Sequence, residues 1–278
     1  MYEDKVIIIT GSTRGIGKSI AERLAMEGAS IVVNGRDRDR VEAVVQDLKK
    51  HHSRIIGIST SVATISGCKQ VVDGALAEFG KIDALINNAG IVRDRISYKM
   101  TEEEWDDVIE THLKGTFGCT KYTVLAMKER QTGGVIINLT SKSGMEGLAG
   151  QLNYSAAKAG IGGMTWTLAK ELKRFGIVVY GVAPVAETDM TKPVIEWILE
   201  ESRKKGKPFP SDWKMGTPDD VATLISTLLS ERPDSGSIYS VNGNRLGIWE
   251  PPKHHTLDLS GNEGKYDNII RSFNGKTQ

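Results

Sequence analysis

The sequence predicts an α/β fold: a doubly wound, mostly parallel sheet of seven strands with helices on both faces. Short runs rich in Val and Ile recur along the chain and suit strands that are buried on both sides. Longer segments of helical pattern separate these runs, and this alternation is typical of βαβ units. We therefore expect one domain over residues 1–245, followed by a C-terminal extension over residues 246–278.

The expected elements begin at recognisable signals. Thr101 and Glu104 form a capping box before the longest helical segment, and Thr217 with Pro218 starts the last helix. Residues 186–215 form an insertion before that helix. The strands are expected at residues 5–10, 31–33, 55–58, 82–86, 134–139, 177–183 and 236–241. The helices are expected at residues 18–27, 41–50, 65–79, 101–130, 154–175 and 217–230.

A glycine-rich turn, residues 11–17 (GSTRGIG), lies between the first strand and the first helix. A helix N-terminus offers free amides and the positive end of its dipole, and glycines allow phosphates to approach the backbone. This context indicates a site for the pyrophosphate of a dinucleotide. The spacing differs from the general G-x-G-x-x-G pattern, so a tight turn without a ligand is the alternative.

The end of the second strand bears on which dinucleotide would bind. In such folds an acidic residue at this point accepts a hydrogen bond from the adenosine ribose. Gly35 stands at the expected position, Arg36 follows it, and Arg14 lies in the glycine turn. Two guanidinium groups suit a 2′-phosphate, which favours NADP(H) over NAD(H). The alternative is that Arg36 belongs to the solvated start of a helix.

Tyr154 and Lys158 are four residues apart on an expected helix, so their side chains lie on one face. A neighbouring ammonium group is expected to lower the pKa of the phenol. Ser141, at the end of the preceding strand, could hydrogen-bond a substrate oxygen. These groups are the ones that reduction of a carbonyl requires besides a hydride donor. An exposed helix face is the alternative for the Tyr-Lys pair.

Composition narrows the classes of function. The net charge of +1 gives no reason to expect nucleic acid or an anionic membrane as partner. The N-terminus lacks a signal-peptide pattern, and no apolar run approaches the roughly 20 residues that span a bilayer. Cys68 and Cys119 are interpreted as reduced residues of a cytoplasmic protein. His254 and His255 stand without further ligands, so no metal site is predicted.

The motifs together resemble those of the short-chain dehydrogenase/reductase family, in order and spacing, over about residues 5–243. They are the glycine turn, residues 87–90 (NNAG), Ser141 and the Tyr154–Lys158 pair. The resemblance implies a Rossmann-like fold, Tyr154 as general acid/base, Lys158 holding the nicotinamide ribose, and Ser141 positioning the carbonyl. It also implies a homodimer or homotetramer that pairs the two long helices. The cofactor contacts it implies are Gly11, Thr13, Arg14, Gly15, Ile16, Gly17, Arg36, Asn88, Ala89, Gly90, Tyr154, Lys158, Pro184 and Thr188.

The chain departs from the family pattern at several positions. His112 stands where the family has an Asn in a proton relay, as also in the (3R)-hydroxyacyl-CoA dehydrogenase domain of multifunctional enzymes. A relay through His112 would depend on the pKa of the imidazole; a packed helix residue is the alternative. The loop from Pro184 to Thr188 lacks a glycine and is one residue short. Ser61 replaces a common Asp.

We therefore expect an NADP(H)-dependent oxidoreductase that interconverts a ketone and a secondary alcohol. Resemblance to 3-oxoacyl-ACP reductases around residues 86–95 and 141–160 favours a 3-oxoacyl or 3-hydroxyacyl thioester, linked to CoA or ACP. Residues 186–215 would form the substrate lid. A sugar, a steroid or another cyclic alcohol is the alternative substrate. A catalytically silent NADP(H)-binding sensor or scaffold is the alternative from another class.

Overall fold

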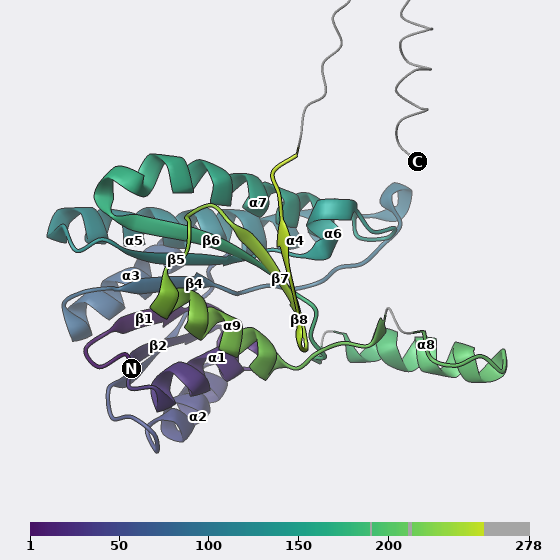
Figure 1. The fold of residues 1–278 in the computed structure, drawn as a ribbon, viewed down its shortest axis with the longest axis horizontal. Helices are drawn as coiled ribbons and strands as arrows, with labels where there is room; N and C mark the ends of the chain where they lie inside the picture. Colours follow the sequence, from purple (N-terminus) through teal and green to yellow (C-terminus); the bar gives the residue numbers. More distant parts are fainter. Residues whose placement is uncertain (190, 211–212, 253–278) are drawn as a thin grey trace, which may run out of the picture.

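The computed structural model describes residues 1–189, 191–210 and 213–252 of the 278-residue chain. The described residues form one sheet of eight strands in the order β3-β2-β1-β4-β5-β6-β7-β8 (Figure 1). All neighbouring strands are parallel except β7 and β8. The strands are β1 (Val6–Ile9), β2 (Ser30–Gly35), β3 (Ile55–Ser59), β4 (Ala84–Asn87), β5 (Gly134–Leu139), β6 (Ile177–Pro184), β7 (Ile238–Asn242) and β8 (Arg245–Trp249).

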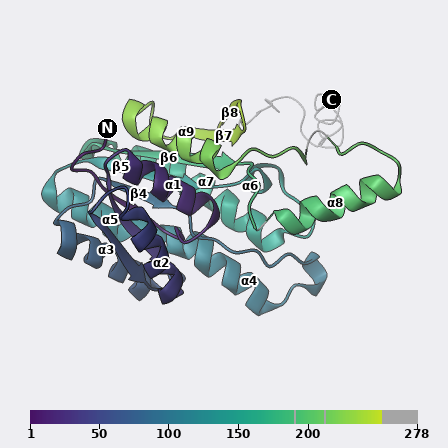
Figure 2. The ribbon, with the colours of Figure 1, turned by 90° about the horizontal axis from the view of Figure 1, so that it is seen from below.

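Helices cover both faces of this sheet, with α1, α2 and α9 on one side and α3, α5 and α7 on the other (Figures 1 and 2). Side chains alternate along β1. Ile7 and Ile9 therefore pack into the apolar core beneath α1, α2 and α9, and Ile8 packs into the core on the opposite face, beneath α3, α5 and α7. The predicted doubly wound fold is thereby confirmed. The helices are α1 (Gly15–Met26), α2 (Arg38–Leu48), α3 (Ile65–Phe79), α4 (Glu102–Ile109), α5 (Gly115–Arg130), α6 (Lys142–Glu146), α7 (Leu152–Leu172), α8 (Lys192–Lys204) and α9 (Pro218–Glu231).

The strand order places a crevice at the carboxyl ends of β1 and β4. The chain runs outward from β1 to β2 and β3, then returns to place β4 on the other side of β1. The connections after β1 and β4 therefore diverge to opposite faces of the sheet. Ligands of open α/β sheets bind at such a point, so the topology locates the site before any side chain is considered.

The prediction of seven strands was wrong by one. An eighth strand, β8, pairs antiparallel with β7. It is formed by the first residues of the segment that was expected to be a C-terminal extension. The two strands are joined by Gly243 and Asn244, and Gly243 has a φ of 56°, which glycine adopts without strain. A Gly-Asn pair between two apolar runs is a hairpin signal. His254 and His255 lie outside the described residues.

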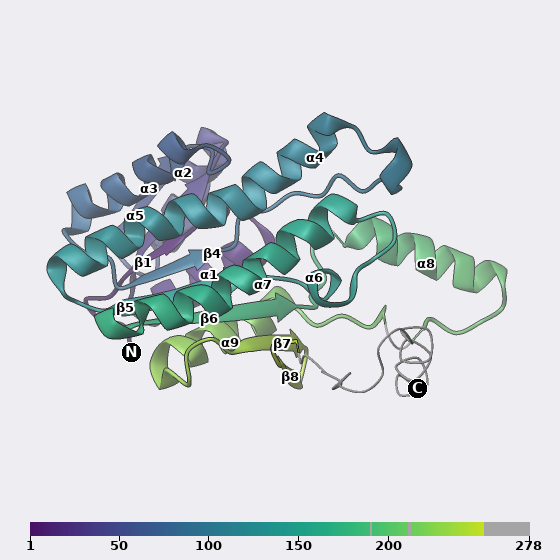
Figure 3. The ribbon, with the colours of Figure 1, turned by 90° about the horizontal axis from the view of Figure 1, so that it is seen from above.

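Two further features differ from, or add to, the expected elements. The long helix expected at residues 101–130 is interrupted by a π-helical turn, Glu110–Lys114, which separates α4 from α5. Within the segment predicted as a lid, α8 extends away from the sheet, as Figures 1 and 3 show. Its Trp197 is 63% exposed. None of the described helices combines the length and the apolar character that crossing a membrane would require.

Candidate functional site

The crevice is lined by residues at or just beyond the carboxyl ends of β1 to β6 and from the helices beside them. All the predicted site residues except Ser141 lie along it. Those residues are Gly11, Thr13, Arg14, Gly15, Ile16, Gly17, Arg36, Asn88, Ala89, Gly90, His112, Tyr154, Lys158, Pro184 and Thr188. Lining residues that the sequence analysis did not single out include Thr60, Val62, Ile91, Thr111, Leu139, Thr140 and Asp189. Several of these directly follow β3 or end β5, and that position is the signal that could have identified them.

The glycine turn is held rigidly against the end of β4. The Asn88 side-chain amide donates to the carbonyl oxygens of Thr10 and Gly11, both at 2.9 Å. Gly11 has a φ of 62°, and a Cβ atom there would lie 2.7 Å from the Cα of Ala89. A Cβ atom on Gly17 would lie 2.4 Å from both the Gly11 oxygen and the Asn88 amide nitrogen. Only glycine fits at these two positions.

This turn suits the pyrophosphate of a dinucleotide. It leads directly into α1, and within the described residues no side chain caps the first amides of that helix. Uncapped amides and the helix dipole favour an anion at this end of the crevice. The residues present therefore fit a dinucleotide. Thr188 lies against the turn, with its Cγ2 atom 3.7 Å from the position of a Gly15 Cβ, so the shortened loop after β6 still reaches it.

The far end of the crevice is basic. A Cβ atom on Gly35 would lie 2.6 Å from the Thr13 Cγ2 atom, so the acidic residue expected here would clash with the glycine turn. In the described part of the chain, neither Arg14 nor Arg36 forms an ion pair, whereas Arg40 pairs with the Asp37 carboxylate. Arg14 and Arg36 therefore offer two guanidinium groups to an anion.

Tyr154 and Lys158 lie at the other end of the crevice, and Ser141 lies beside Tyr154 without lining the crevice itself. Lys158 is buried, and its ammonium group donates to the carbonyl oxygen of Leu139. Its nitrogen lies 5.6 Å from the centroid of the Tyr154 ring. Ser141 caps the N-terminus of α6, and its Oγ atom accepts from the Ser143 amide at 3.2 Å. The Ser141 hydroxyl lies close enough to Tyr154 to lower the pKa of the phenol.

The expectation that Lys158 lowers the pKa of Tyr154 was wrong for this structure. Burial raises the pKa of Tyr154 to about 12, against the lowering effect of the Ser141 hydroxyl. Burial also lowers the pKa of Lys158 to about 7. The Lys158 ammonium group contacts the Leu139 carbonyl oxygen and does not act on the Tyr154 pKa. Desolvation is the largest cause of the shift in both pKa values.

His112 lies in the π-helical turn and is 2% exposed. Burial, with the charge of Lys158, lowers the pKa of His112 to about 3, so the imidazole is neutral near pH 7 and does not titrate in the range the sequence suggested. Its Nε2 atom lies 2.7 Å from the Ile91 oxygen, and its ring meets that of Tyr154 edge-on at 5.2 Å. Its Nδ1 atom is buried and has no hydrogen-bond partner in the described residues.

The sequence model of the short chain dehydrogenase family matches residues 5–199 of the chain. The protein belongs to this family. It is therefore an NAD(P)-dependent oxidoreductase that acts on CH–OH groups, and the resemblance drawn from the motifs is confirmed.

Similar proteins include two 3-oxoacyl-[acyl-carrier-protein] reductases and a short chain dehydrogenase of known structure. The chain is 39% identical to the 3-oxoacyl-[acyl-carrier-protein] reductase FabG of Staphylococcus epidermidis over 244 residues, which cover 86% of this chain and 98% of that protein. It is 38% identical to the 3-oxoacyl-[acyl-carrier-protein] reductase of Synechocystis sp., over 87% of this chain and 97% of that protein. The crystal structure of a short chain dehydrogenase from Mycobacterium avium matches with a TM-score of 0.86 at 30% identity, covering 99% of this chain and 96% of that one.

Proposed function

We propose that the protein is an NADP(H)-dependent reductase of 3-oxoacyl thioesters, or the reverse dehydrogenase. One observation carries the proposal: a single crevice is lined by the glycine turn at one end and by Tyr154 and Lys158 at the other. A dinucleotide laid along the crevice, with its pyrophosphate at the glycine turn, would reach both ends. Arg14 and Arg36 support NADP(H), because two guanidinium groups suit a 2′-phosphate.

The chemistry follows from these groups. When bound, the nicotinamide dinucleotide supplies or accepts the hydride. Ser141 donates a hydrogen bond to the carbonyl oxygen of the substrate, and Tyr154 delivers the proton that this oxygen takes up as the alcohol forms. Lys158, with its pKa near 7, returns a proton to Tyr154 and holds the ribose. No bound metal is needed for this step, since the phenol proton neutralises the developing alkoxide.

His112 takes the relay position in this proposal. Its neutral imidazole faces the Tyr154 ring, and its buried Nδ1 atom has acceptor capacity that no described residue uses. A water molecule hydrogen-bonded there would extend the path for protons toward Lys158. The pH dependence of turnover would then follow Lys158 and Tyr154, because His112 remains neutral.

The substrate class rests on the relatives, two of which are named 3-oxoacyl-[acyl-carrier-protein] reductases. A CoA- or ACP-linked thioester is accordingly the proposed substrate, with the segment around α8 as its lid. A homodimer or homotetramer is proposed as the assembly, because Phe117 and Leu125 on α5 and Leu152 on α7 expose apolar side chains. Retention of Ser141, Tyr154 and Lys158 argues against a silent sensor.

Replacing Tyr154 tests the proposal. The variant Tyr154→Phe should lower kcat for NADPH-driven reduction of a 3-oxoacyl-CoA by about 10²- to 10⁴-fold, since the proton donor is lost. Its Kd for NADPH, measured by fluorescence titration, should stay within about twofold, because the phosphates bind at the glycine turn. Turnover at the wild-type rate would remove Tyr154 from the mechanism. Faster wild-type reduction of a cyclic ketone or a sugar than of the thioester would favour the alternative substrate class.

A further inference from the structure

Gln151 lies three residues before Tyr154, where three segments of the chain converge. These are the loop that follows β4, the turn containing α6, and the start of α7. The backbone joins two of them, since the Arg95 amide donates to the Gly150 oxygen at 2.7 Å and Arg95 forms a parallel bridge with Gln151. The side chain of Gln151 is therefore placed between the loop and the α6 turn.

That side chain connects the two segments through a directed series of hydrogen bonds. The Gln151 Nε2 atom donates to the Asp94 carboxylate at 2.9 Å, and the Ser143 hydroxyl donates to the Gln151 Oε1 atom at 3.0 Å. A carboxylate can only accept, so this contact fixes which end of the amide faces Asp94. The Ser143 backbone amide then donates to the Ser141 Oγ atom. The proton of the Ser141 hydroxyl is left free to point toward Tyr154 or a substrate oxygen.

Among the described residues, the Gln151 side chain forms no hydrogen bonds besides those to Asp94 and Ser143. Gln151 is the N-cap residue of α7, yet its side chain makes no capping hydrogen bond. The backbone amide of Tyr154 instead donates to the side-chain oxygen of Asn153 at 2.7 Å. Asn153 also donates to the Arg93 and Glu104 oxygens, which anchors this end of α7 independently. Loss of the Gln151 amide should therefore leave the helix in place.

We propose that Gln151 is a positioning residue for the reduction: by bridging Asp94 and Ser143 it fixes the turn that presents the Ser141 hydroxyl, and it holds the Asp94 carboxylate near Tyr154. This inference rests on the proposed function, which assigns the chemistry to Ser141 and Tyr154. The negative charge of Asp94 contributes to the raised pKa of Tyr154. The bridge therefore affects the orientation of the Ser141 hydroxyl and the negative charge near Tyr154.

Four other ionisable groups lie near this bridge, two beside Tyr154 and two on the loop that holds Asp94. Lys158, on α7, and neutral His112, in the π-helical turn, both lie beside the Tyr154 ring. On the loop beside Asp94, Arg93 pairs with Asp107 and Arg95 pairs with Glu104. Because both arginines have carboxylate partners of their own, Asp94 is the charge on this loop whose removal should be felt by Tyr154.

Three variants divide the two roles. Gln151→Met keeps the length of the side chain and removes both hydrogen bonds, and should lower kcat about 10- to 100-fold with the Kd for NADPH unchanged. Ser143→Ala breaks the bridge from its other end, and the double variant should be no slower than the slower single one. Asp94→Asn keeps an oxygen acceptor for Gln151 and removes the charge, so the pH profile of kcat/KM should move to lower pH by about half a unit. Lys142→Ala, on the exposed side of the same turn, is the control and should behave as wild type.

A readout without turnover separates this inference from the proposed function. In protein labelled with ¹³Cζ-tyrosine, the Tyr154 resonance is assigned by its absence in Tyr154→Phe. Gln151→Met should shift that resonance, and Asp94→Asn should lower the midpoint of its titration. A wild-type rate with an unshifted resonance in Gln151→Met would overturn the inference. A shifted resonance in a protein that reduces no carbonyl substrate would support the bridge and overturn the proposed function. If Gln151→Met does not fold, Ser143→Ala decides by the same two measurements.

Discussion

The proposed preference for NADP(H) rests on single residues at the basic end of the crevice. Gly35 leaves no space for the acid that a free ribose would need, because a side chain there would meet Thr13. Arg36 is exposed and lacks an ion pair among the described residues, whereas Arg38, two positions on, pairs with Glu42 at 2.7 Å. Two arginines in the same exposed run therefore differ in the one property that a phosphate contact requires.

Substituting these two arginines tests the preference for NADP(H). Arg36→Ala should raise the Kd for NADPH about 10- to 100-fold, since a hydrogen bond to a charged group contributes about 1.5–3 kcal/mol. The Kd for NADH should change by less than about twofold. Arg38→Ala serves as the matched control and should leave both constants unchanged. Equal losses for the two cofactors on Arg36→Ala would refute the phosphate contact.

The sequence predicted which residues would lie near the crevice better than it predicted their pKa values. Tyr154, Lys158 and the glycine turn could be found because their spacing is fixed by one helix or one turn. The pKa of Tyr154 could not be found, because burial depends on chain segments far away. Gln151 was missed for the same reason, as its partner Asp94 is 57 residues distant in the chain.

At the scale of elements, the sheet core was predictable and its last strand was not. The β-branched runs at β1, β2 and β5 are buried on both faces, so their pattern needs no partner to be recognised. In β8, Leu246 and Ile248 remain exposed, so the strand lacks the fully buried pattern of the sheet core. It also lies beyond the seven strands after which the domain was expected to end. The π-helical turn at His112 was missed as well, because one extra residue in a turn leaves the helical pattern nearly unchanged.

The starts of α4 and α9 were predicted from their capping residues, and the capping box of α9 makes its start testable. The Thr217 hydroxyl accepts from the Asp220 amide, while the Asp220 carboxylate accepts from the Thr217 amide at 2.6 Å. Thr217→Ala should lower the free energy of unfolding by about 1 kcal/mol, measured by urea denaturation. Thr223→Ala, on the exposed face of the same helix, removes only a bond to the backbone of Asp219 and should cost less than about 0.5 kcal/mol. Equal losses for the two variants would contradict the capping role.

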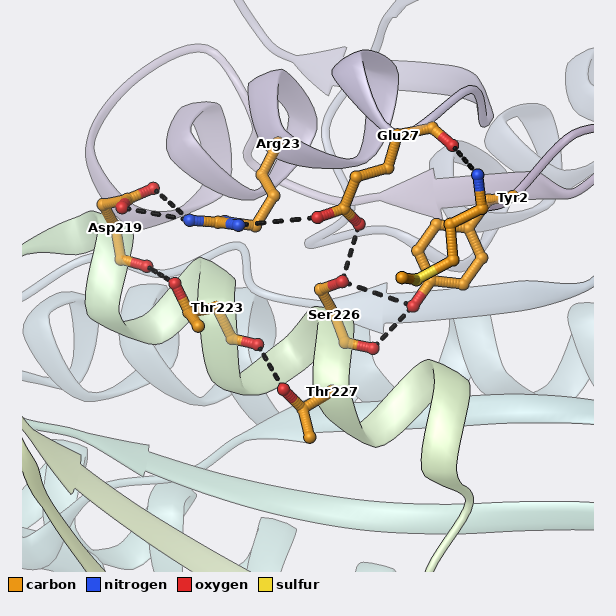
Figure 4. Close-up of polar contacts among 8 residues, drawn as sticks. Tyr2, Arg23, Glu27, Asp219, Thr223, Ser226 and Thr227 are labelled. Atoms are coloured by element: carbon orange, nitrogen blue, oxygen red, sulfur yellow. Dashed lines mark hydrogen bonds and ion pairs between the residues drawn. The ribbon is translucent and has the colours of Figure 1, made fainter.

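At the scale of the whole molecule, a cluster of polar side chains connects the N-terminal residues with α1 and α9. Figure 4 shows Tyr2, Glu27 at the end of α1, and Ser226 on α9 converging in one place. The Tyr2 hydroxyl donates to the Ser226 carbonyl oxygen, and the Ser226 hydroxyl donates to the Glu27 carboxylate, both at 2.6 Å. Arg23 connects Glu27 to Asp219. Because α1 begins at the glycine turn, this cluster braces the helix whose other end faces the crevice.

Removing the Ser226 hydroxyl tests whether this brace serves stability or binding. Ser226→Ala leaves Glu27 with one donor fewer in a half-buried site and should lower the free energy of unfolding by about 1–2 kcal/mol. Tyr2→Phe should cost about 1 kcal/mol, and the double variant less than the sum, because the hydroxyls share one network. The Kd for NADPH should not change, since Asn88 fixes the glycine turn from the β4 side. If a variant that is still fully folded binds NADPH more weakly, the position of the first turn of α1 depends on the contacts at the C-terminal end of that helix. The crevice would then be less rigid than its hydrogen bonds suggest.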